Sequence, residues 1–235
     1  MTASLASTTR RVEAEWLDSL PALDPRARQA RRDLERVNAL MGNAAIVARE
    51  LARGLARNAR TLAEVGAGDG GFLRAVAAHR ALHGRTFRAT LVDRQPCAER
   101  ANVDALAERG WQPAAVQADA FAWLAVNGAG YDAIVANLFL HHFEPAALAY
   151  LLARIARRTT LFVACEPRRS VAGRLGASLL PFLGCNDVTR HDAAVSVRAG
   201  FVDGEIAALW PERHGWRIRE GRRGPFSHLF VARRA

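Results

Sequence analysis

The chain has 235 residues, half of them hydrophobic, and a formal net charge of +10 at pH 7. This length suits one α/β domain with a large core, and this composition excludes a globally disordered chain. No apolar run reaches the ~18 residues of a membrane-spanning helix and the start of the chain lacks an apolar signal core, so no membrane span and a cytoplasmic location are expected.

The first predicted elements are two helices between residues 26 and 58. Apolar residues recur there at helical spacing, and Gly42 followed by Asn43 marks a break between the two helices. Residues 1–58 are therefore predicted to form an N-terminal helical cap, although residues 1–25 are only loosely patterned.

Strands and helices then alternate as far as residue 165. The predicted strands are 61–65, 86–92, 114–118, 131–136 and 159–165, and the predicted helices are 71–81, 96–109, 119–126 and 144–157. This alternation predicts a parallel sheet with right-handed crossovers.

The pattern changes after Glu166. Two helix-like pieces, 170–180 and 191–199, form a predicted lid insertion at about 167–200, and a short helix near 203–208 follows it.

The chain closes with the strand-like stretches GWRIREG and FSHLFVARR, which predict a hairpin. The predicted fold class is α/β: a doubly wound seven-stranded sheet, mostly parallel with an antiparallel C-terminal strand, and helices on both faces. Residues 59–235 would form this Rossmann-like core.

A glycine-rich stretch links the first strand to the helix that follows. Gly66, Gly68 and Gly71 fit the dinucleotide pattern GxGxxG, whereas Gly66, Gly68 and Gly70 fit GxGxG with Glu64 two positions before it. Either pattern lets a ligand approach the backbone at a helix N-terminus.

Two further residues fit either cofactor. Asp93 ends the second strand, where a carboxylate can accept hydrogen bonds from ribose hydroxyls. Arg94 beside it could pair with a 2′-phosphate.

Three features favour S-adenosyl-L-methionine over a dinucleotide. Glu64 and Asp69 place negative charge in the loop, which suits a cationic amino acid better than a pyrophosphate. Asp119 follows the third strand directly, where it can accept a hydrogen bond from an adenine amino group. The closing hairpin is the third feature, because an antiparallel last strand beside the fifth strand resembles the sheet of S-adenosylmethionine-dependent methyltransferases.

These residues resemble the class I S-adenosylmethionine-dependent methyltransferases. EVGAGDG (64–70) is similar to that family's first motif, Asp93 to its second-strand acid, ADA (118–120) to its adenine motif, and YDAIVANLFLHHF (131–143) to its fourth strand and loop. The likeness covers about residues 60–165, and the loop resembles those of small-molecule enzymes of quinone and polyketide metabolism. The cofactor-binding residues are therefore predicted to be Glu64, Gly66, Ala67, Gly68, Asp69, Gly70, Asp93, Arg94, Asp119, Ala120, Phe121, Asn137 and Leu138.

The candidate catalytic residues are histidines. His141 and His142 follow the fourth strand, where the acceptor should arrive, and His191 lies in the lid insertion. A histidine can take a proton from the acceptor, or it can simply pack or be solvated. Glu166, just past the fifth strand, is expected to end that strand at a turn.

The sequence contains no His, Asp or Glu set at metal-ligand spacing, and its three cysteines are widely separated, so no metal site is expected. The N-P-P-[YF] loop expected of enzymes that methylate nucleic-acid bases or glutamine is replaced by NLFL (137–140). All 33 basic residues are arginines spread along the chain, which argues against a nucleic-acid partner.

The acceptor pocket is predicted to be built from residues 26–58, 138–143 and 167–200, and the apolar residues of these segments favour an aromatic or lipid-like small molecule. The leading interpretation is a methyltransferase of bacterial secondary or quinone metabolism, directed to oxygen more than to nitrogen or carbon. A nicotinamide-dependent oxidoreductase and an RNA-binding protein of methyltransferase fold remain the alternatives, and a homodimer is left open.

Overall fold

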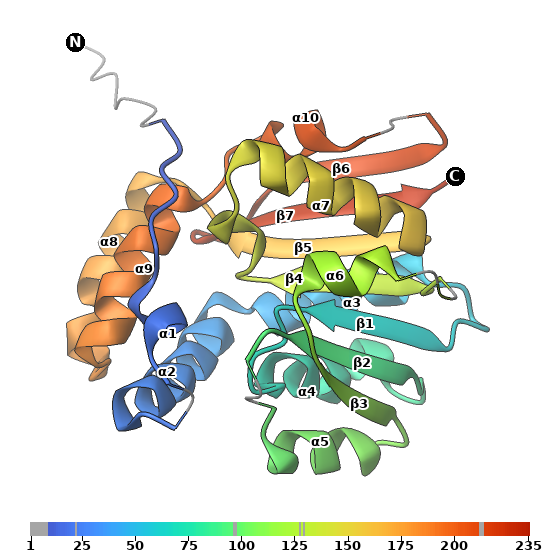
Figure 1. The fold of residues 1–235 in the computed structure, drawn as a ribbon, viewed down its shortest axis with the longest axis horizontal. Coiled ribbons are helices and arrows are strands. Elements are labelled where there is room, and N and C mark those ends of the chain that lie inside the picture. Colours follow the sequence, from blue (N-terminus) through green and yellow to red (C-terminus); the bar gives the residue numbers. More distant parts are fainter. Residues whose placement is uncertain (1–8, 22, 96–97, 127, 129, 212–213) are drawn as a thin grey trace.

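The computed structural model describes residues 9–21, 23–95, 98–126, 128, 130–211 and 214–235. Its strands form one seven-stranded sheet in the order β3-β2-β1-β4-β5-β7-β6 (Figure 1). The strands are β1 (Thr61–Val65), β2 (Arg88–Asp93), β3 (Gln112–Gln117), β4 (Ala133–Asn137), β5 (Leu161–Pro167), β6 (Trp216–Arg223) and β7 (Ser227–Arg234). Strands β1 to β5 pair in parallel, whereas β7 pairs antiparallel with both of its neighbours, so the predicted fold class is confirmed.

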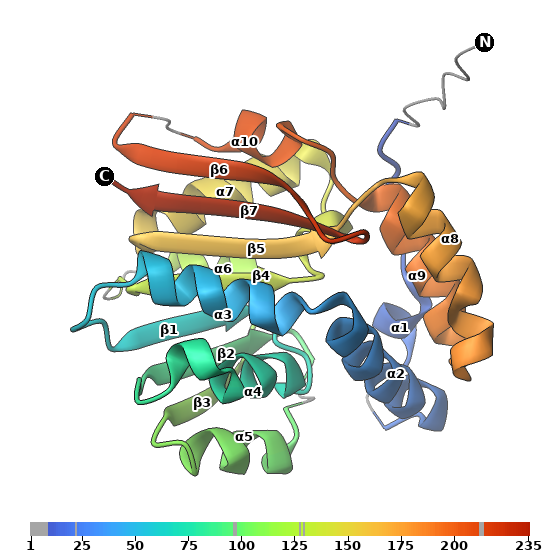
Figure 2. The ribbon, with the colours of Figure 1, turned by 180° about the vertical axis from the view of Figure 1, so that it is seen from behind.

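Helices cover both faces of the sheet (Figures 1 and 2). One face carries α3 (Asn43–Gly54), α4 (Gly71–Ala78) and α5 (Arg100–Ala107), and the other carries α6 (Ala120–Ala125), α7 (Pro145–Arg158) and α10 (Glu205–Leu209). The remaining helices are α1 (Trp16–Ser19), α2 (Pro25–Met41), α8 (Val171–Leu179) and α9 (Asp187–Ala199), with the 3₁₀ helices η1 (Arg80–Leu82), η2 (Leu140–His142) and η3 (Leu180–Leu183). No helix within the described ranges has the length and apolar character needed to cross a bilayer.

The central strands are apolar on both faces because helices bury both. In β5, Leu161, Val163 and Cys165 pack into the core on the α3 side, and Phe162 and Ala164 pack into the core on the α7 side. This two-residue alternation is the side-chain period of a strand.

The predicted break between the N-terminal helices is confirmed. Gly42 has a left-handed φ of +69°, and it separates α2 from α3. Of the predicted cap, α3 packs on the sheet, where Val47 and Leu51 lie in the same core cluster as Leu161.

Helices α1, α2, α8 and α9 gather beyond the carboxyl ends of the parallel strands (Figures 1 and 2). α9 contacts both α1 and α2, although α1 lies in a segment without a helical pattern. α9 also begins earlier than the predicted 191, because Asn186 caps it by accepting a hydrogen bond from Thr189 N at 2.9 Å. α5 begins at Arg100, and residues 96–97 of its predicted range lie outside the described residues.

Candidate active site

The glycine loop between β1 and α4 needs its glycines for two reasons. Gly66 has φ of +71° and Gly68 has φ of +55°, a backbone conformation that favours glycine. A Cβ on Gly66 would lie 2.3 Å from Cδ2 of Phe139, whereas a Cβ on Gly68 would meet nothing within 4 Å. The loop therefore packs tightly on one side and leaves open space beside Gly68.

That open space belongs to two adjoining cavities. The glycine-loop cavity, about 410 Å³, lies between the loop and α2, and it is lined by Glu64, Asp69 and Asn137 among others. The Asp93 cavity, about 300 Å³, is lined by Asp93 and Asp119. Gly66, Gly68 and Arg31 line both cavities.

Glu64 is the strongest indication of a cationic ligand. Its side chain is 1 % exposed, and its Oε2 atom has no hydrogen-bond partner among the described residues. Burial, with a smaller contribution from Asp69 and Asp93, raises the pKa of Glu64 well above its usual value. A buried carboxylate without a partner is costly, so the site fits the ammonium group of a methionyl moiety.

Asp93 and Asp119 are held in place by backbone amides. Gly68 N donates to Asp93 Oδ2 at 2.9 Å, and Gln95 N donates to its Oδ1 at 2.8 Å. Asp119 caps α6 by accepting from Phe121 N at 2.9 Å and Ala122 N at 3.1 Å. An ionised carboxylate has about four acceptor positions, so both residues retain capacity for ribose hydroxyls and an adenine amino group.

Most of the predicted cofactor-binding residues line one of these two cavities. Glu64, Gly66, Ala67, Gly68, Asp69, Asn137 and Leu138 line the first, and Asp93, Arg94, Asp119 and Ala120 line the second. Gly70 and Phe121 line neither: Gly70 shapes the turn with φ of +83°, and the Phe121 ring packs edge-on against Phe143.

Residues of the N-terminal helices also belong to the site, and no sequence motif indicates them. Asn137 Nδ2 donates to Asn38 Oδ1 at 3.0 Å, and Asn43 Nδ2 donates to Asn137 Oδ1 at 3.0 Å. Arg31 and Asn38, both on α2, line the glycine-loop cavity. Only the packing of α2 over the carboxyl ends of the strands reveals their involvement.

The loop after β4 is strained and firmly anchored. Leu138 has φ of +50°, the one positive φ at a residue other than glycine in the described ranges. Glu166 is fully buried within β5, rather than at a turn, and it accepts hydrogen bonds from Phe139 N at 3.1 Å and Leu140 N at 3.0 Å. Strain of this kind persists where the surroundings hold the backbone, and it is common at functional sites.

The histidines differ in their surroundings. His141 is buried between two carboxylates, with Nδ1 2.8 Å from Glu166 Oε2 and Nε2 3.2 Å from Glu15 Oε1. Burial alone would lower the pKa of His141, but the hydrogen bonds to Glu15 and Glu166 outweigh burial and raise the pKa to about 9. A histidine paired in this way is poorly suited to act as a general base near neutral pH.

The other two histidines also have structural partners. His142 donates from Nδ1 to the Phe139 carbonyl at 3.0 Å and lines the Asp93 cavity. His191 stacks on Trp16 with ring centroids 3.9 Å apart, and its Nδ1 lies 2.9 Å from Asp192 Oδ1. None of these three histidines lines the apolar cavity between α2 and the α8–α9 insertion. Their positions and contacts therefore give no support to the prediction that a histidine acts as the base.

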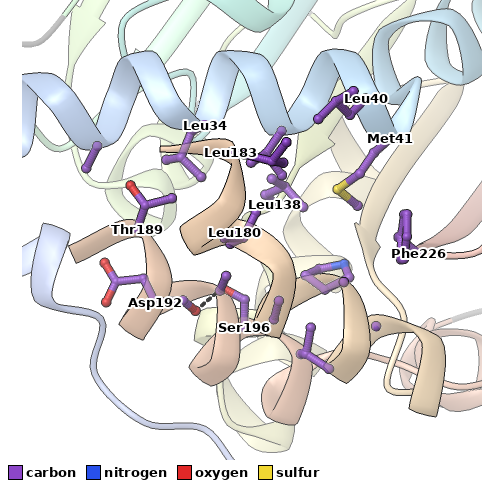
Figure 3. Close-up of a pocket in the computed structure, with 18 of the residues that line it drawn as sticks. Leu34, Leu40, Met41, Leu138, Leu180, Leu183, Thr189, Asp192, Ser196 and Phe226 are labelled. Carbon is purple, nitrogen blue, oxygen red and sulfur yellow. Dashed lines mark hydrogen bonds between the residues drawn. The ribbon is translucent and has the colours of Figure 1, made fainter. Parts of the chain in front are cut away.

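This third cavity, about 220 Å³, lies between α2 and the α8–α9 insertion (Figure 3). Leu34 and Met41 of α2 and Leu180 of η3 line its apolar wall, and Leu138 and Leu34 line both this apolar cavity and the glycine-loop cavity. Its polar side chains are Glu15, Thr189, Asp192 and Ser196. The segments predicted to build an acceptor pocket therefore do enclose one cavity.

Comparisons with known proteins agree with this arrangement. Residues 62–160 match a family described as a methyltransferase domain, and no curated protein matches the chain. Similar solved structures include an O-methyltransferase family protein from Burkholderia thailandensis, with 19% identity and a TM-score of 0.63 over 91% of this chain. The mitomycin 7-O-methyltransferase MmcR has 25% identity and a TM-score of 0.57 over 93% of this chain. The plantazolicin methyltransferase BpumL, in complex with SAH, has 11% identity and a TM-score of 0.62 over 91% of this chain.

The chain spans 61% of the Burkholderia protein, 60% of MmcR and 92% of BpumL. Residues 62–160 contain the glycine loop, Asp93 and Asp119, so the family match and the cavities coincide. Residues 62–160 therefore match a methyltransferase domain, in agreement with the class I S-adenosylmethionine-dependent motifs predicted for this part of the chain.

Proposed function

We propose that this protein methylates a hydroxyl oxygen of a small, apolar, aromatic acceptor bound in the apolar cavity. The observation that carries the proposal is the junction of two cavities at Leu138, which lines both the apolar cavity and the glycine-loop cavity. A methyl donor on one side and an acceptor on the other would meet at this residue. The names of two similar structures, an O-methyltransferase and a mitomycin 7-O-methyltransferase, support oxygen as the acceptor atom.

The residues around the donor would hold it in a single orientation. In this proposal Glu64 pairs with the methionyl ammonium, Asp93 accepts from the ribose hydroxyls and Asp119 from the adenine. S-adenosylmethionine supplies an activated methyl group on a sulfonium, which needs alignment with the acceptor more than it needs further activation. Orientation of this kind can contribute several kcal/mol to the rate.

Removal of a proton from the acceptor is a lesser requirement than alignment of the acceptor with the methyl group. Glu15 lines the apolar cavity, but its contacts with the His141 and His142 imidazoles outweigh burial and hold the pKa of its carboxyl below its usual value. Glu15 is therefore a weak base, and the predicted histidines have other partners. An acceptor that is itself acidic, such as a phenol, suits this site best.

The rim of the apolar cavity favours an acceptor with an apolar tail. Leu40, Leu179 and Leu183 line the cavity and are 67%, 55% and 47% exposed, and the neighbouring Phe182 is 85% exposed. Side chains of this size are costly to leave in water when they form one patch. An alkyl chain that leaves the cavity would cover them.

For a series of alkyl phenols, we therefore expect KM to fall as the chain lengthens. Each buried methylene is worth about 0.8 kcal/mol, or roughly fourfold in affinity, until the rim is covered. Methyl transfer from labelled S-adenosylmethionine measures this, and a KM independent of chain length would contradict the assignment of the cavity.

Filling the apolar cavity should block the acceptor and spare the cofactor. Val37 lines this cavity from α2, so Val37→Trp is expected to raise the KM for the acceptor at least tenfold and to leave S-adenosylhomocysteine affinity unchanged. Val126→Trp is the matched control, because Val126 is 66% exposed at the end of α6 and outside all three cavities. Equal KM values for the two variants would place the acceptor elsewhere.

Asp93→Ala tests the ribose contact. Loss of charge-assisted hydrogen bonds should cost about 1.5–3 kcal/mol, which weakens S-adenosylhomocysteine binding by roughly 10- to 150-fold. Calorimetry measures the dissociation constant, and a constant unchanged from the wild type would mean that other groups hold the ribose.

A further inference from the structure

Glu15, His141 and His142 converge in a way that the proposed reaction does not require. His141 Nε2 lies 3.2 Å from Glu15 Oε1, and His142 Nε2 lies 3.2 Å from Glu15 Oε2. One ligand-type atom from each residue lies within 4.8 Å of the other two. Sequence spacing does not reveal this group, because Glu15 precedes His141 by 126 residues.

The far side of each imidazole ring is already fixed. His141 Nδ1 lies 2.8 Å from Glu166 Oε2, and His142 Nδ1 lies 3.0 Å from the Phe139 carbonyl oxygen. Metal-binding histidines have this arrangement, in which the second ring nitrogen donates to a carboxylate or a backbone carbonyl. It turns both Nε2 atoms toward Glu15, and a metal ion bound there would displace the proton from Nε2 of His141.

The Nε2 atom of His142 gives a second, independent indication of a cation at this position. A carbonyl oxygen can only accept, so His142 Nδ1 carries the hydrogen, and Nε2 of the neutral ring presents a lone pair toward Glu15. This Nε2 atom is buried and forms no hydrogen bond of good geometry within the described part of the chain. A lone pair that faces a carboxylate at 3.2 Å is repulsive unless Nε2 binds a cation, which is either a proton or a metal ion that Glu15 also binds.

We propose that Glu15, His141 and His142 bind one divalent ion of the zinc type. The ligands would be the two Nε2 atoms and a carboxylate oxygen, a nitrogen-rich set that suits Zn²⁺ far better than Mg²⁺ or Ca²⁺. Ligands about 2.0–2.1 Å from a tetrahedral zinc ion lie about 3.3 Å apart, close to the two 3.2 Å separations in the structure. Three protein ligands leave one position of such an ion open.

The backbone around Glu15 is positioned without the ion. We call residues 9–19 the N-terminal strap; Figure 1 shows it passing along α9 into α1. Before Glu15, the Arg10 guanidinium donates to the carbonyls of His141 at 2.9 Å and Phe143 at 2.8 Å. After Glu15, Trp16 N and Leu17 N donate to the Asp192 carboxylate at 2.8 and 3.0 Å. An ion would find its ligands prearranged, between the apolar cavity that Glu15 lines and the Asp93 cavity that His142 lines.

The test is metal binding by the full chain, without a histidine tag and stripped of metal by a chelator. Calorimetric titration with Zn²⁺ is expected to show one site per chain, and Co²⁺ is expected to give the strong visible absorption of a four- or five-coordinate ion. Mg²⁺ should give neither signal. No cofactor or acceptor is present, so the result is independent of the proposed methyl transfer.

Three variants locate the ion. His142→Ala and Glu15→Gln each remove a ligand, and each should weaken Zn²⁺ binding by more than the ~10–100-fold that loss of an outer-shell partner costs. His83→Ala is the matched control, because His83 is an exposed histidine outside the group, and it should bind Zn²⁺ like the wild type. Thermal melting without metal checks that each variant folds.

The proposal is overturned if Zn²⁺ does not bind to the wild type at one equivalent. It is also overturned if Glu15→Gln and His142→Ala, with melting curves that show a folded chain, bind Zn²⁺ as tightly as His83→Ala. Should one of the two variants fail to fold, the other decides by the same comparison. If both fail to fold, the Co²⁺ spectrum of the wild type decides, since a spectrum without nitrogen ligation rejects the site.

Discussion

Glu166→Ala is expected to destabilise the protein by about 3–5 kcal/mol, which lowers the melting temperature of a chain of this size by roughly 6–20 °C. The Glu166 carboxylate is fully buried and accepts hydrogen bonds from Phe139 N and Leu140 N. It also pairs with the buried His141 ring. Its removal leaves the Phe139 and Leu140 amides and Nδ1 of the buried His141 ring without this partner, and nothing of similar size replaces it.

Thermal unfolding followed by circular dichroism measures this effect. The matched control is Glu108→Ala, because Glu108 is an exposed glutamate at the end of α5. Glu166→Gln keeps one acceptor oxygen and should fall between the wild type and Glu166→Ala. A melting temperature of Glu166→Ala equal to that of Glu108→Ala would show that the loop after β4 does not depend on this carboxylate.

Glu64→Gln is expected to have opposite effects on stability and on binding. The folded-state pKa of Glu64 is raised, chiefly by burial, so the folded chain holds this proton more tightly than the unfolded chain does. Stability therefore falls as pH rises from the usual pKa of a glutamate toward the raised one, and a neutral glutamine avoids this loss. The variant without cofactor should be more stable than the wild type, by a margin that grows by about 1.4 kcal/mol for each pH unit between those two pKa values.

The same substitution should weaken cofactor binding. A glutamine cannot pair its charge with the methionyl ammonium, so we expect a loss of about 1.5–3 kcal/mol, or roughly 10- to 150-fold in affinity for S-adenosylhomocysteine. The wild type must also ionise Glu64 when the ligand binds, so binding should release a proton. Calorimetry in two buffers of different ionisation enthalpy detects that proton, and its absence from the wild type would show that Glu64 does not face the ammonium.

The elements of the fold follow from local pattern, and so do the parts of the site that lie on one strand–turn–helix unit. Gly66, Gly68 and Asp93 could be placed because the carboxyl ends of neighbouring parallel strands meet at one edge. Asp119 follows for the same reason, and the structure adds that it caps α6.

The remaining parts of the site depend on contacts between segments that lie far apart in the sequence. Glu15 reaches His141 across 126 residues, and Asn38 reaches Asn137 across 99. The strap that carries Glu15 has no helical or strand period, so nothing local indicates where it packs. The surroundings of the histidines were equally hidden, because the environment of His141 is set by Glu166 on the next strand and by the strap.

Cofactor choice is the central claim, and calorimetric titration of the wild-type chain with S-adenosylhomocysteine and, separately, with NAD⁺ tests it most directly. Glu64 is buried beside the glycine loop, and its Oε2 atom has no hydrogen-bond partner in the described part of the chain, which predicts one S-adenosylhomocysteine per chain and no heat of binding from NAD⁺. Asp93→Ala, titrated alongside, should show the weakened binding expected of a lost ribose contact. Saturable binding of NAD⁺ with none of S-adenosylhomocysteine would contradict the account.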